Sequence, residues 1–427
     1  MQGPRTTAPH GLRQPGSTNT KHGTSVVVAR DPQALSAFVP AWEELAAAAL
    51  EPNVFYEHWM LLPALKAFGA GNISVVLVLI HDPRNPGAPA KLGGLFPLER
   101  IVRFGKLKVS VLSLWQHVHC YACTPLVRSD VAGECVLELF RWFRSGGASA
   151  SMLELKCISG DGPFQKMLVD LSNKLGLPIC TTDIFTRGLW RGGYDKNTNP
   201  ESAVSGDLRR RLRRKEKRLS ESGRVEHLVM QPHDDIGRWI DEFLQIEASG
   251  WKGQRGTALA CSESERRYFA EIAISAFRRG RLLMLGLNFN GRPIARRCAF
   301  VAGEGSFAFK TAYDEEFADF SPGTMLEMDS IQQLRALPGV LWMDSCAAAD
   351  NFLVNRLSND RKTIQTLTVG SGALGELVVS SLPLLRWMNQ RILKRSPVDT
   401  PAHPPHGSES WDAPKSAEMK ETKTCKL

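Results

Sequence analysis

The stretch that decides the fold runs from Leu282 to Tyr313 and reads LLMLGLNFNGRPIARRCAFVAGEGSFAFKTAY. It contains three apolar runs, Leu282–Phe289, Pro293–Val301 and Ser306–Tyr313, and Asn290-Gly291 separates the first two. Asn-Gly between apolar runs is the strongest short signal for a β-hairpin, because both residues tolerate positive φ. The stretch therefore predicts three antiparallel strands.

A helix is predicted before these strands, and alternating helices and strands are predicted after them. The preceding helix is marked by apolar residues at helical spacing, which are Ile236, Ile240, Phe243, Leu244 and Ile246. The next helix is expected to begin at Ser321-Pro322-Gly323 and to reach Leu337. Ser supplies a side-chain acceptor at the N-cap, and Pro suits the first helical position because an amide there would have no partner within the helix. The elements expected after it are a strand at Val340–Ser345, a helix at Asn351–Ser358 and a strand at Thr363–Val369. This order predicts a mixed α+β layer fold.

The first half of the chain repeats this pattern. A helical stretch at Gln33–Leu50 is followed by apolar runs at Ile73–Ile80 and Leu92–Leu98, which a Pro- and Gly-rich turn separates. The similar order in both halves indicates an internal duplication.

The chain of 427 residues is long enough for two domains between two polar tails. Residues 1–24 and 395–427 are rich in Gly, Pro, Ser and charged residues, so both tails are expected to be disordered. We expect a first domain at 25–195, a linker and basic helix at 196–219, and a second domain at 220–394.

Composition excludes a membrane-spanning chain and indicates a cytoplasmic protein. The longest unbroken apolar run, Val75–Ile80, is far shorter than the roughly 20 residues that a spanning helix needs. Nine cysteines, an odd number in a long chain, favour reduced thiols over a disulfide scaffold. Residues 374–395 combine apolar and basic residues, which is compatible with a terminal helix docked on the body or with peripheral contact at the inner face of a membrane.

Positive charge is concentrated in one segment. The chain has 53 Lys plus Arg and 44 Asp plus Glu, a net charge of +9, and residues 208–218 hold eight bases and one acid. This concentration argues against a nucleic-acid-binding face spread over a whole domain. The segment could hold phosphates of nucleic acid or anionic lipid. The simpler interpretation is a solvated helix packed through Leu208, Leu212 and Leu219.

An ordered set of short motifs resembles the GCN5-related N-acetyltransferase (GNAT) superfamily, specifically its CelD/BcsL-type acetyltransferase branch, with a duplicated FemABX-like architecture. The motifs are Ser249–Gly253 (SGWKG), Arg255–Leu259 (RGTAL), Asn290–Ala295 (NGRPIA), Ala312–Asp314 (AYD), Ser321–Gly323 (SPG), Met343–Cys346 (MDSC), Gly93–Leu98 (GGLFPL) and Thr124–Val127 (TPLV). The resemblance implies two tandem acyl-CoA N-acyltransferase domains, each a mixed, mostly antiparallel sheet flanked by helices. It also implies that the second domain is catalytic.

The same resemblance implies an acyltransferase that moves an acyl group, expected to be acetyl, from a CoA thioester to an amine or hydroxyl. The expected acceptor is a sugar, a polysaccharide precursor or a similar small molecule, and acyl-CoA is a co-substrate rather than a tightly bound cofactor. Two alternatives stay open. One is a FemABX-like transferase that takes an aminoacyl group from tRNA, which would use the basic segment, and the other is a catalytically silent scaffold at a membrane surface.

The resemblance places the site between the fourth and fifth strands of the second domain, which part around the thioester. Acyl transfer needs a base and a proton donor. We expect Asp344 or Asp350 to be the base and Tyr313 to protonate the leaving thiolate. The helix start should leave about four amides unpaired, so Ser321, Pro322, Gly323 and Thr324 are the expected pyrophosphate site, against the alternative of an ordinary capped helix. The expected acceptor-binding residues are Trp251, Lys252, Arg255, Lys310 and Asp314.

Two further side-chain groups carry weaker expectations. Cys346 could be an acyl-accepting nucleophile, but no His lies near it in the sequence. His117, His119, Cys120 and Cys123 offer four potential zinc ligands, yet a zinc motif usually pairs two separated clusters and the sequence has no second one. We therefore expect no metal site.

Overall fold

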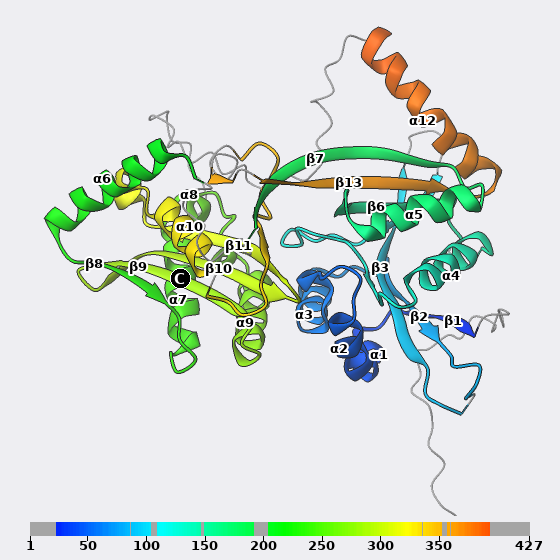
Figure 1. Ribbon diagram of the computed structural model, residues 1–427, viewed down its shortest axis with the longest axis horizontal. Helices are drawn as coiled ribbons and strands as arrows, with labels where there is room; N and C mark the ends of the chain where they lie inside the picture. Colours follow the sequence, from blue (N-terminus) through cyan, green and yellow to red (C-terminus); the bar gives the residue numbers. More distant parts are fainter. Residues whose placement is uncertain are drawn as a thin grey trace, which may run out of the picture. The chain divides into compact units, whose positions relative to one another are not determined.

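The computed structural model divides the chain into two compact units (Figure 1). Unit 1 comprises residues 1–185 and 363–404, and unit 2 comprises residues 186–362 and 405–427. The residues that the structure describes are 23–85, 87–103, 109–146, 149–191, 204–334, 336–351, 357–358 and 360–392.

Unit 2 is built on a mixed sheet in the order β7-β12-β11-β10-β9-β8. The strands are β7 (Ile179–Arg191, of which residues 186–191 belong to this unit), β8 (Val225–Val229), β9 (Leu282–Phe289), β10 (Arg292–Ala302), β11 (Gly305–Tyr313) and β12 (Trp342–Asp344). The predicted hairpin is confirmed, because β9 and β10 pair antiparallel across a two-residue turn in which Asn290 has φ 50° and Gly291 has φ 78°. Positive φ at both positions is what the type I′ turn requires.

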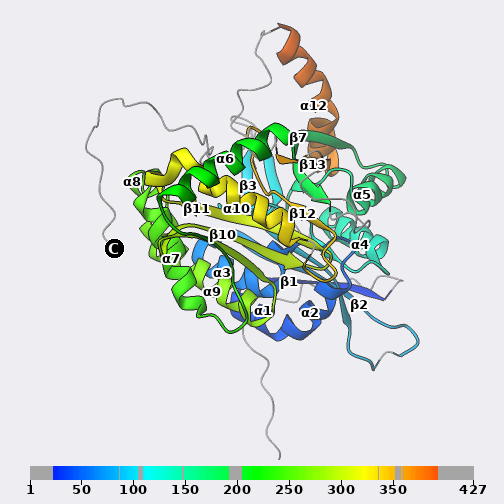
Figure 2. The same cartoon turned by 60° about the vertical axis from the view of Figure 1, so that its left-hand side comes forward.

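Helices cover both faces of this sheet. They are α6 (Gly206–Ser222), α7 (Ile236–Ser249), α8 (Trp251–Gln254), α9 (Glu263–Arg278) and α10 (Pro322–Gln333), with short 3-10 turns η4 (Leu259–Cys261) and η5 (Glu315–Phe320). Figure 2 shows α10 along one face of the strands, with α6 beside it. Gly286 of β9 instead faces Trp239 of α7 on the other side. Successive residues of a strand point to opposite faces, so one strand packs against both helical layers.

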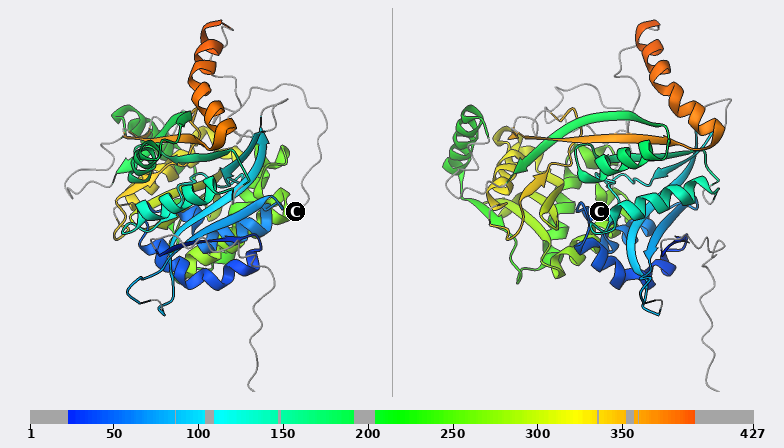
Figure 3. Two further views of the ribbon diagram at one scale, coloured as in Figure 1. Left: turned by 90° about the vertical axis from the view of Figure 1, so that its right-hand side faces the viewer. Right: turned by 45° about the vertical axis from the view of Figure 1, so that its right-hand side comes forward.

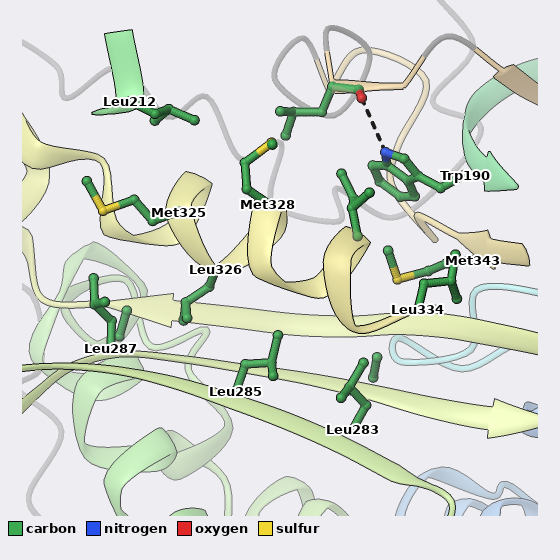
Figure 4. Packing of buried hydrophobic residues seen from close by; sticks show 14 of the residues in the cluster. Trp190, Leu212, Leu283, Leu285, Leu287, Met325, Leu326, Met328, Leu334 and Met343 are labelled. Atoms are coloured by element: carbon green, nitrogen blue, oxygen red, sulfur yellow. Dashed lines mark hydrogen bonds between the residues drawn. The ribbon is translucent and has the colours of Figure 1, made fainter. Parts of the chain in front are cut away.

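The core of unit 2 lies between β9 and α10. Figure 4 shows Leu283, Leu285 and Leu287 of β9 beneath α10, with Leu326 pointing toward them. Leu212 of α6 closes the same cluster from above. The leucine spacing that the sequence shows on the basic segment therefore fixes which side of α6 is buried.

Unit 1 repeats the arrangement with the strand order β1-β2-β3-β4-β6-β13. Its strands are β1 (Thr24–Ala29), β2 (Ile73–Ile80), β3 (Lys91–Arg103), β4 (Val109–Leu114), β5 (Leu126–Val127, beside β3), β6 (Met152–Ser159) and β13 (Asp360–Gly370). Its helical elements are α1 (Pro32–Leu35), η1 (Ser36–Phe38), α2 (Val39–Ala47), η2 (Val54–Tyr56), α3 (His58–Phe68), α4 (Ala132–Arg144), α5 (Pro163–Lys174) and α12 (Gly372–Ile392). The mixed α+β class predicted from the sequence is thus confirmed.

The two units share one topology, and each takes its last strand from the other half of the sequence. In both units an antiparallel meander is followed by a helix and a parallel strand, β6 beside β4 and β12 beside β11. That strand then pairs antiparallel with β13 in unit 1 and with β7 in unit 2. The division therefore differs from the expected one, which assigned residues up to 195 to the first domain and 220–394 to the second.

Several predicted boundaries change in the structure. The single helix expected at Gln33–Leu50 is divided into α1, η1 and α2, because Pro40 at the start of α2 lacks an amide donor and its ring would clash in a continuous helix. Helix α10 ends at Gln333 rather than at Leu337, and β12 is shorter than Val340–Ser345. Thr24, which was assigned to the N-terminal tail, begins β1.

Other predictions lie outside the described residues. These are the two disordered tails apart from residues 23–24, the linker part (196–203) of the segment 196–219, and most of the helix at Asn351–Ser358.

The terminal helix α12 is docked at one end and exposed at the other. Val379 is buried against Val109, Val111 and Met152 of unit 1. Figure 3 shows the far end of α12 (orange) projecting beyond these strands, and its exposed apolar residues include Leu377, Leu384, Leu385 and Trp387. Within the described ranges, no helix is both long and apolar enough to cross a membrane.

Candidate active site

Strands β11 and β12 lie side by side for three residue pairs only. The pairs run from Gly305 with Trp342 to Phe307 with Asp344, and β11 then continues through Ala308–Tyr313 without β12. Gly305 is required at this junction, because a Cβ there would lie 2.2 Å from the Trp342 ring. The expectation that two neighbouring strands of the C-terminal half part is confirmed.

Unit 1 does not repeat this open edge. Its equivalent strand β4 pairs with β6 over Val111–Ser113 and ends one residue later, at Leu114. The backbone that follows β4 is held in place, since Tyr56 Oη donates to the Trp115 carbonyl at 2.8 Å. The long strand edge that could receive an extended ligand therefore belongs to β11 in unit 2.

Asp344 lies where the strands part, and its carboxylate is fully engaged. Arg187 Nε is 2.7 Å from Oδ1, Arg187 Nη2 donates to Oδ2 at 2.8 Å, and Lys362 Nζ is 3.0 Å from Oδ2. The Cys346 amide also donates to Oδ1 at 2.9 Å. Burial opposes ionisation, but the two cations outweigh it and hold the pKa of Asp344 well below its usual range. A carboxylate in this state is a weak proton acceptor, so the geometry favours a structural ion pair over the general base expected from the sequence.

Tyr313 and Asp344 are not brought together. Phe307 is the residue of β11 that lies opposite Asp344, and Tyr313 follows six positions later. At ~3.3 Å per residue this separates the two positions by about 20 Å along the strand. One reacting thioester therefore cannot contact both side chains, and their expected pairing as acid and base does not fit the structure.

Asp350 differs from Asp344 in its surroundings. It lies in an exposed turn six residues after the end of β12. In the part of the chain that the structure describes, its carboxylate has no ion-pair partner. Cys346, between the two acids, is buried and has φ 52°, a left-handed conformation that is uncommon outside glycine.

Lys310 belongs to a buried charge cluster that the sequence did not reveal. Its Nζ lies 3.2 Å from Glu247 Oε1, and Lys252 Nζ lies 3.5 Å from the same oxygen. The Leu259 amide donates to Glu247 Oε2 at 2.8 Å. Burial alone would raise the pKa of Glu247, but Lys310 and Lys252 outweigh it and leave the pKa lowered. The available signal was position 247 itself, which continues the apolar stripe of Ile240 and Phe243 and so places a carboxylate where it needs partners.

Trp251, Lys252 and Arg255 come together around α8. The Arg255 guanidinium carbon lies 5.1 Å and Lys252 Nζ lies 5.8 Å from the centre of the Trp251 ring. The Trp251 amide donates to Glu315 Oε1 at 2.7 Å, which anchors the start of α8. This arrangement offers a half-buried aromatic surface with two cations beside it.

Asp314, the other expected acceptor-binding residue, has local partners. Its Oδ1 accepts from the Glu316 amide at 3.0 Å and so caps η5, while Oδ2 pairs with Arg292. Both carboxylate oxygens of Asp314 therefore have partners within the chain, as a helix cap and in an ion pair, and neither is presented to a ligand.

The start of α10 differs from the expected anion cradle. Ser321 is the N-cap and Pro322 follows it as predicted, but Ser321 has φ 58° and its side chain makes no capping bond. Its Oγ instead accepts from Lys215 Nζ at 2.7 Å. The prediction of about four unpaired amides is wrong: Pro322 has none, and the Ser321 and Thr324 amides donate to the Ala318 and Ser321 carbonyls. Pro322, Gly323 and Thr324 are buried, so Ser321 and Lys215 form the accessible part of this end.

The four candidate zinc ligands lie in unit 1, where the cysteines contact each other and His117 contacts an aromatic ring. Cys120 Sγ and Cys123 Sγ are 3.8 Å apart, and His117 stacks on Phe68 with ring centres 4.8 Å apart. Over the residues with described positions, no group of three or more His, Cys, Asp or Glu side chains could hold a metal ion.

Comparison with known proteins agrees with this geometry. Residues 206–352 match the family model described as an acetyltransferase (GNAT) domain. The structure is similar to FemX, with 9% identity and a TM-score of 0.50 over 77% of this chain and 95% of that one.

Weaker similarities extend to two other solved structures. L-PGS from Bacillus licheniformis has 13% identity and a TM-score of 0.44 over 86% of this chain and 98% of that one. A tandem GNAT protein from the clavulanic acid biosynthesis pathway has 13% identity and a TM-score of 0.41, over 81% and 98%. No curated protein sequence matches this chain. Residues 206–352 thus match a GNAT acetyltransferase domain, and the fold of the chain is similar to that of FemX.

Proposed function

We propose that the chain transfers an acyl group, acetyl in the simplest case, from a CoA thioester to an amine or hydroxyl of a sugar or polysaccharide precursor, as in the CelD/BcsL branch. The observation that carries this proposal is the open edge of β11 beyond Phe307. A strand edge with unpaired amides and carbonyls offers hydrogen bonds to an extended amide-containing ligand, which the pantetheine arm of CoA is.

The proposed donor lies along Ala308–Tyr313 with its diphosphate toward the start of α10. The Lys215 ammonium beside Ser321 Oγ supplies positive charge at that end, and the Gly323 amide is its remaining unbonded donor among the residues described. In this arrangement the thioester reaches the point where β12 ends. Tyr313 then borders the diphosphate end of the donor rather than the reacting carbon.

We assign proton acceptance to Asp350 and a positioning role to Asp344. Asp350 is exposed and lacks an ion-pair partner among the described residues, whereas Asp344 is occupied by Arg187 and Lys362. Through its bond to the Cys346 amide, Asp344 fixes the turn from which Asp350 follows. Replacement of Asp350 by Asn should slow turnover by about 100-fold or more, because the proton acceptor is lost.

The proposed acceptor site is the surface around α8. Trp251 with the flanking Lys252 and Arg255 suits a polar or anionic sugar, because an aromatic face packs on a sugar ring while cations bind its substituents. Lys310 lies on the same open strand and links this surface to the donor edge through Glu247.

Calorimetric titration of acetyl-CoA into the full-length chain tests the donor assignment. We expect binding with 1:1 stoichiometry, and Lys215→Met should weaken it by about tenfold because one charge-assisted contact is lost. Lys166→Met, an exposed lysine on α5, is the matched control and should leave the affinity unchanged. The assignment fails if neither CoA nor an acyl-CoA binds at millimolar concentration.

A second candidate, aminoacyl transfer from charged tRNA, draws on the cations of α6. Tight binding of aminoacyl-tRNA that weakens steeply with salt and needs Arg209–Arg214 would favour it over acyl-CoA transfer.

We also propose that α12 contacts a membrane peripherally. Its exposed Leu384 and Trp387 flank Arg386, whose guanidinium also donates to the Thr181 carbonyl. Exposed apolar residues with a basic residue among them suit an anionic interface. The intact chain should co-sediment with anionic liposomes, and Leu384→Glu with Trp387→Glu should abolish this. Liposome binding that the double variant retains would contradict the contact.

A further inference from the structure

Two cysteine thiols that take no part in the proposed acyl transfer lie in contact inside unit 1. Cys120 and Cys123 form a Cys-x-x-Cys motif in the segment between β4 and β5, and their Sγ atoms are 3.8 Å apart. Because a disulfide has an S–S distance of about 2.0 Å, the two sulfur atoms need to approach by less than ~2 Å to form a bond. The pair is therefore a dithiol that small side-chain rotations bring to bonding distance.

The backbone of this segment is held by side chains and backbone groups from other elements. Asn53, at the start of η2, donates through Nδ2 to the Ala122 carbonyl at 3.0 Å. The Cys123 amide donates to the Cys157 carbonyl of β6 at 2.9 Å, and Cys157 Sγ donates to the Tyr121 carbonyl at 3.3 Å. These bonds fix both residues between the two cysteines, so the fold itself imposes the contact between the thiols.

Burial decides which reagents reach the pair. Cys120 is 1% exposed and Cys123 is 0% exposed, so bulky thiol reagents are excluded from the folded chain. Burial also raises the pKa of the Cys123 thiol well above its usual range, which makes its reactive thiolate scarce at neutral pH. Hydrogen peroxide is little larger than water and needs only a small local opening to enter. The oxidant that fits this site is therefore a small hydroperoxide, and its reaction should be slow at neutral pH.

We propose that Cys120 and Cys123 are a redox-active thiol pair that hydrogen peroxide converts to a disulfide in the folded protein. In the first step one sulfur attacks the peroxide, the O–O bond breaks, and a sulfenic acid and one water molecule form. In the second step the other sulfur attacks the sulfenic sulfur, the S–S bond forms as the S–O bond breaks, and a second water molecule leaves. The two thiols lose two electrons and the peroxide gains them.

The contact between the thiols favours the disulfide over further oxidation. The second thiol already touches the first, so a sulfenic acid on either residue has its resolving thiol beside it and closes before a second peroxide arrives. The assignment concerns unit 1 alone and does not depend on acyl transfer.

Peroxide treatment of the full-length folded chain, followed by tryptic peptide mapping, tests the proposal. Cys120 and Cys123 lie in one tryptic peptide, 109–128, whereas Cys157 lies in another, 157–166. After peroxide at about pH 8, unfolding and alkylation, peptide 109–128 should carry no alkyl group and weigh about 2 Da less than its reduced form. Dithiothreitol should restore both alkylation sites.

Two variants and an unfolded sample complete the experiment. Cys120→Ala should abolish the loss of 2 Da, and Cys135→Ala, which removes another buried thiol on α4, should keep it. The same treatment of wild type in urea shows whether the link requires the fold. The map of the wild-type chain needs no variant, so the test stands even where a variant fails to fold.

Any of four results would overturn the proposal. They are full alkylation of peptide 109–128 after prolonged peroxide, a sulfinic or sulfonic acid on that peptide in place of the link, a cross-link from Cys123 to Cys157 that joins the two peptides, and a link that forms in urea but not in the folded chain.

Discussion

Arg187 of β7 and Asp344 of β12 form an ion pair in which neither side chain is more than 2% exposed. The two residues are 157 positions apart in the sequence, and Lys362 at the start of β13 joins them on the same carboxylate. One buried acid thus holds β7, β12 and the first residues of β13 at the point where β11 and β12 part.

Asp344→Asn should destabilise the protein strongly. The amide would leave the Arg187 guanidinium and the Lys362 ammonium without their counter-charge, and breaking a buried pair in this way costs about 3–5 kcal/mol. Urea unfolding measures the loss. Asp360→Asn is the control, because its pair with Arg191 is exposed and should contribute about 1 kcal/mol or less. Equal, small losses in the two variants would show that the buried pair does not hold the strands.

His227 should make the stability of unit 2 depend on pH. Its Nδ1 lies 2.6 Å from Asp329 Oδ2 and its Nε2 lies 3.0 Å from Glu216 Oε1, so the ring connects β8 to α10 and α6. The hydrogen bond to Asp329 is the largest cause that raises the pKa of His227, and burial opposes it. A raised folded-state pKa means that the stabilisation is fully present below the unfolded value of about 6.5 and is lost as the pH rises through the folded value.

The test of this dependence is urea unfolding of wild type and His227→Gln at several pH values. The free-energy difference between them should be largest below pH ~6.5 and shrink at higher pH, and it should stay near 1 kcal/mol or less because the pair is partly solvent-screened. His233→Gln removes an exposed histidine that does not connect these elements and is the control variant. A difference that grows with pH would reverse the assigned sign.

Tyr313→Phe distinguishes a donor-binding role from an acid role. The ring packs against the core of unit 2, so the variant should keep its fold. Since Tyr313 lies about 20 Å along β11 from the position opposite Asp344, we expect a several-fold rise in the KM for acetyl-CoA with kcat nearly unchanged. Tyr268→Phe on α9 is the control. If turnover instead slows by about 100-fold or more while KM stays constant, the donor-binding role is contradicted and Tyr313 acts as the proton donor.

Glu247→Gln should lower the stability of unit 2. The variant removes the charge that Lys310 and Lys252 share inside unit 2, with an expected loss of about 3 kcal/mol. Glu263→Gln on the surface of α9 pairs with two exposed arginines and should cost almost nothing. Thermal unfolding compares the two, and similar melting temperatures would contradict a structural role for the Glu247 cluster.

Local signals explain which parts of the fold could be predicted. The bounds of β9 agree with the prediction because alternating apolar residues and the Asn290-Gly291 turn act within a few residues of each other. The exchange of β7 and β13 between the units was not predicted, since strand pairings across more than 150 residues leave no local pattern.

The candidate site shows the same limit. The sequence placed Asp344 at a strand end but could not reveal Arg187, and it identified Ser321 as an N-cap but could not reveal Lys215, 106 residues away, at its hydroxyl. Trp251, Lys252 and Arg255 were grouped correctly because they lie within one turn of helix.

The account depends most on the open edge of β11, and hydrogen exchange of the full-length chain with and without acetyl-CoA tests it most directly. Amides in Ala308–Tyr313 that point away from β10 have no strand partner among the described residues and should exchange quickly in the free protein. Saturating acetyl-CoA should slow their exchange by about tenfold or more, while the equivalent region of β4 in unit 1 stays unchanged. If acetyl-CoA binds without protecting β11, or if these amides are already protected in the free protein, no donor occupies this edge.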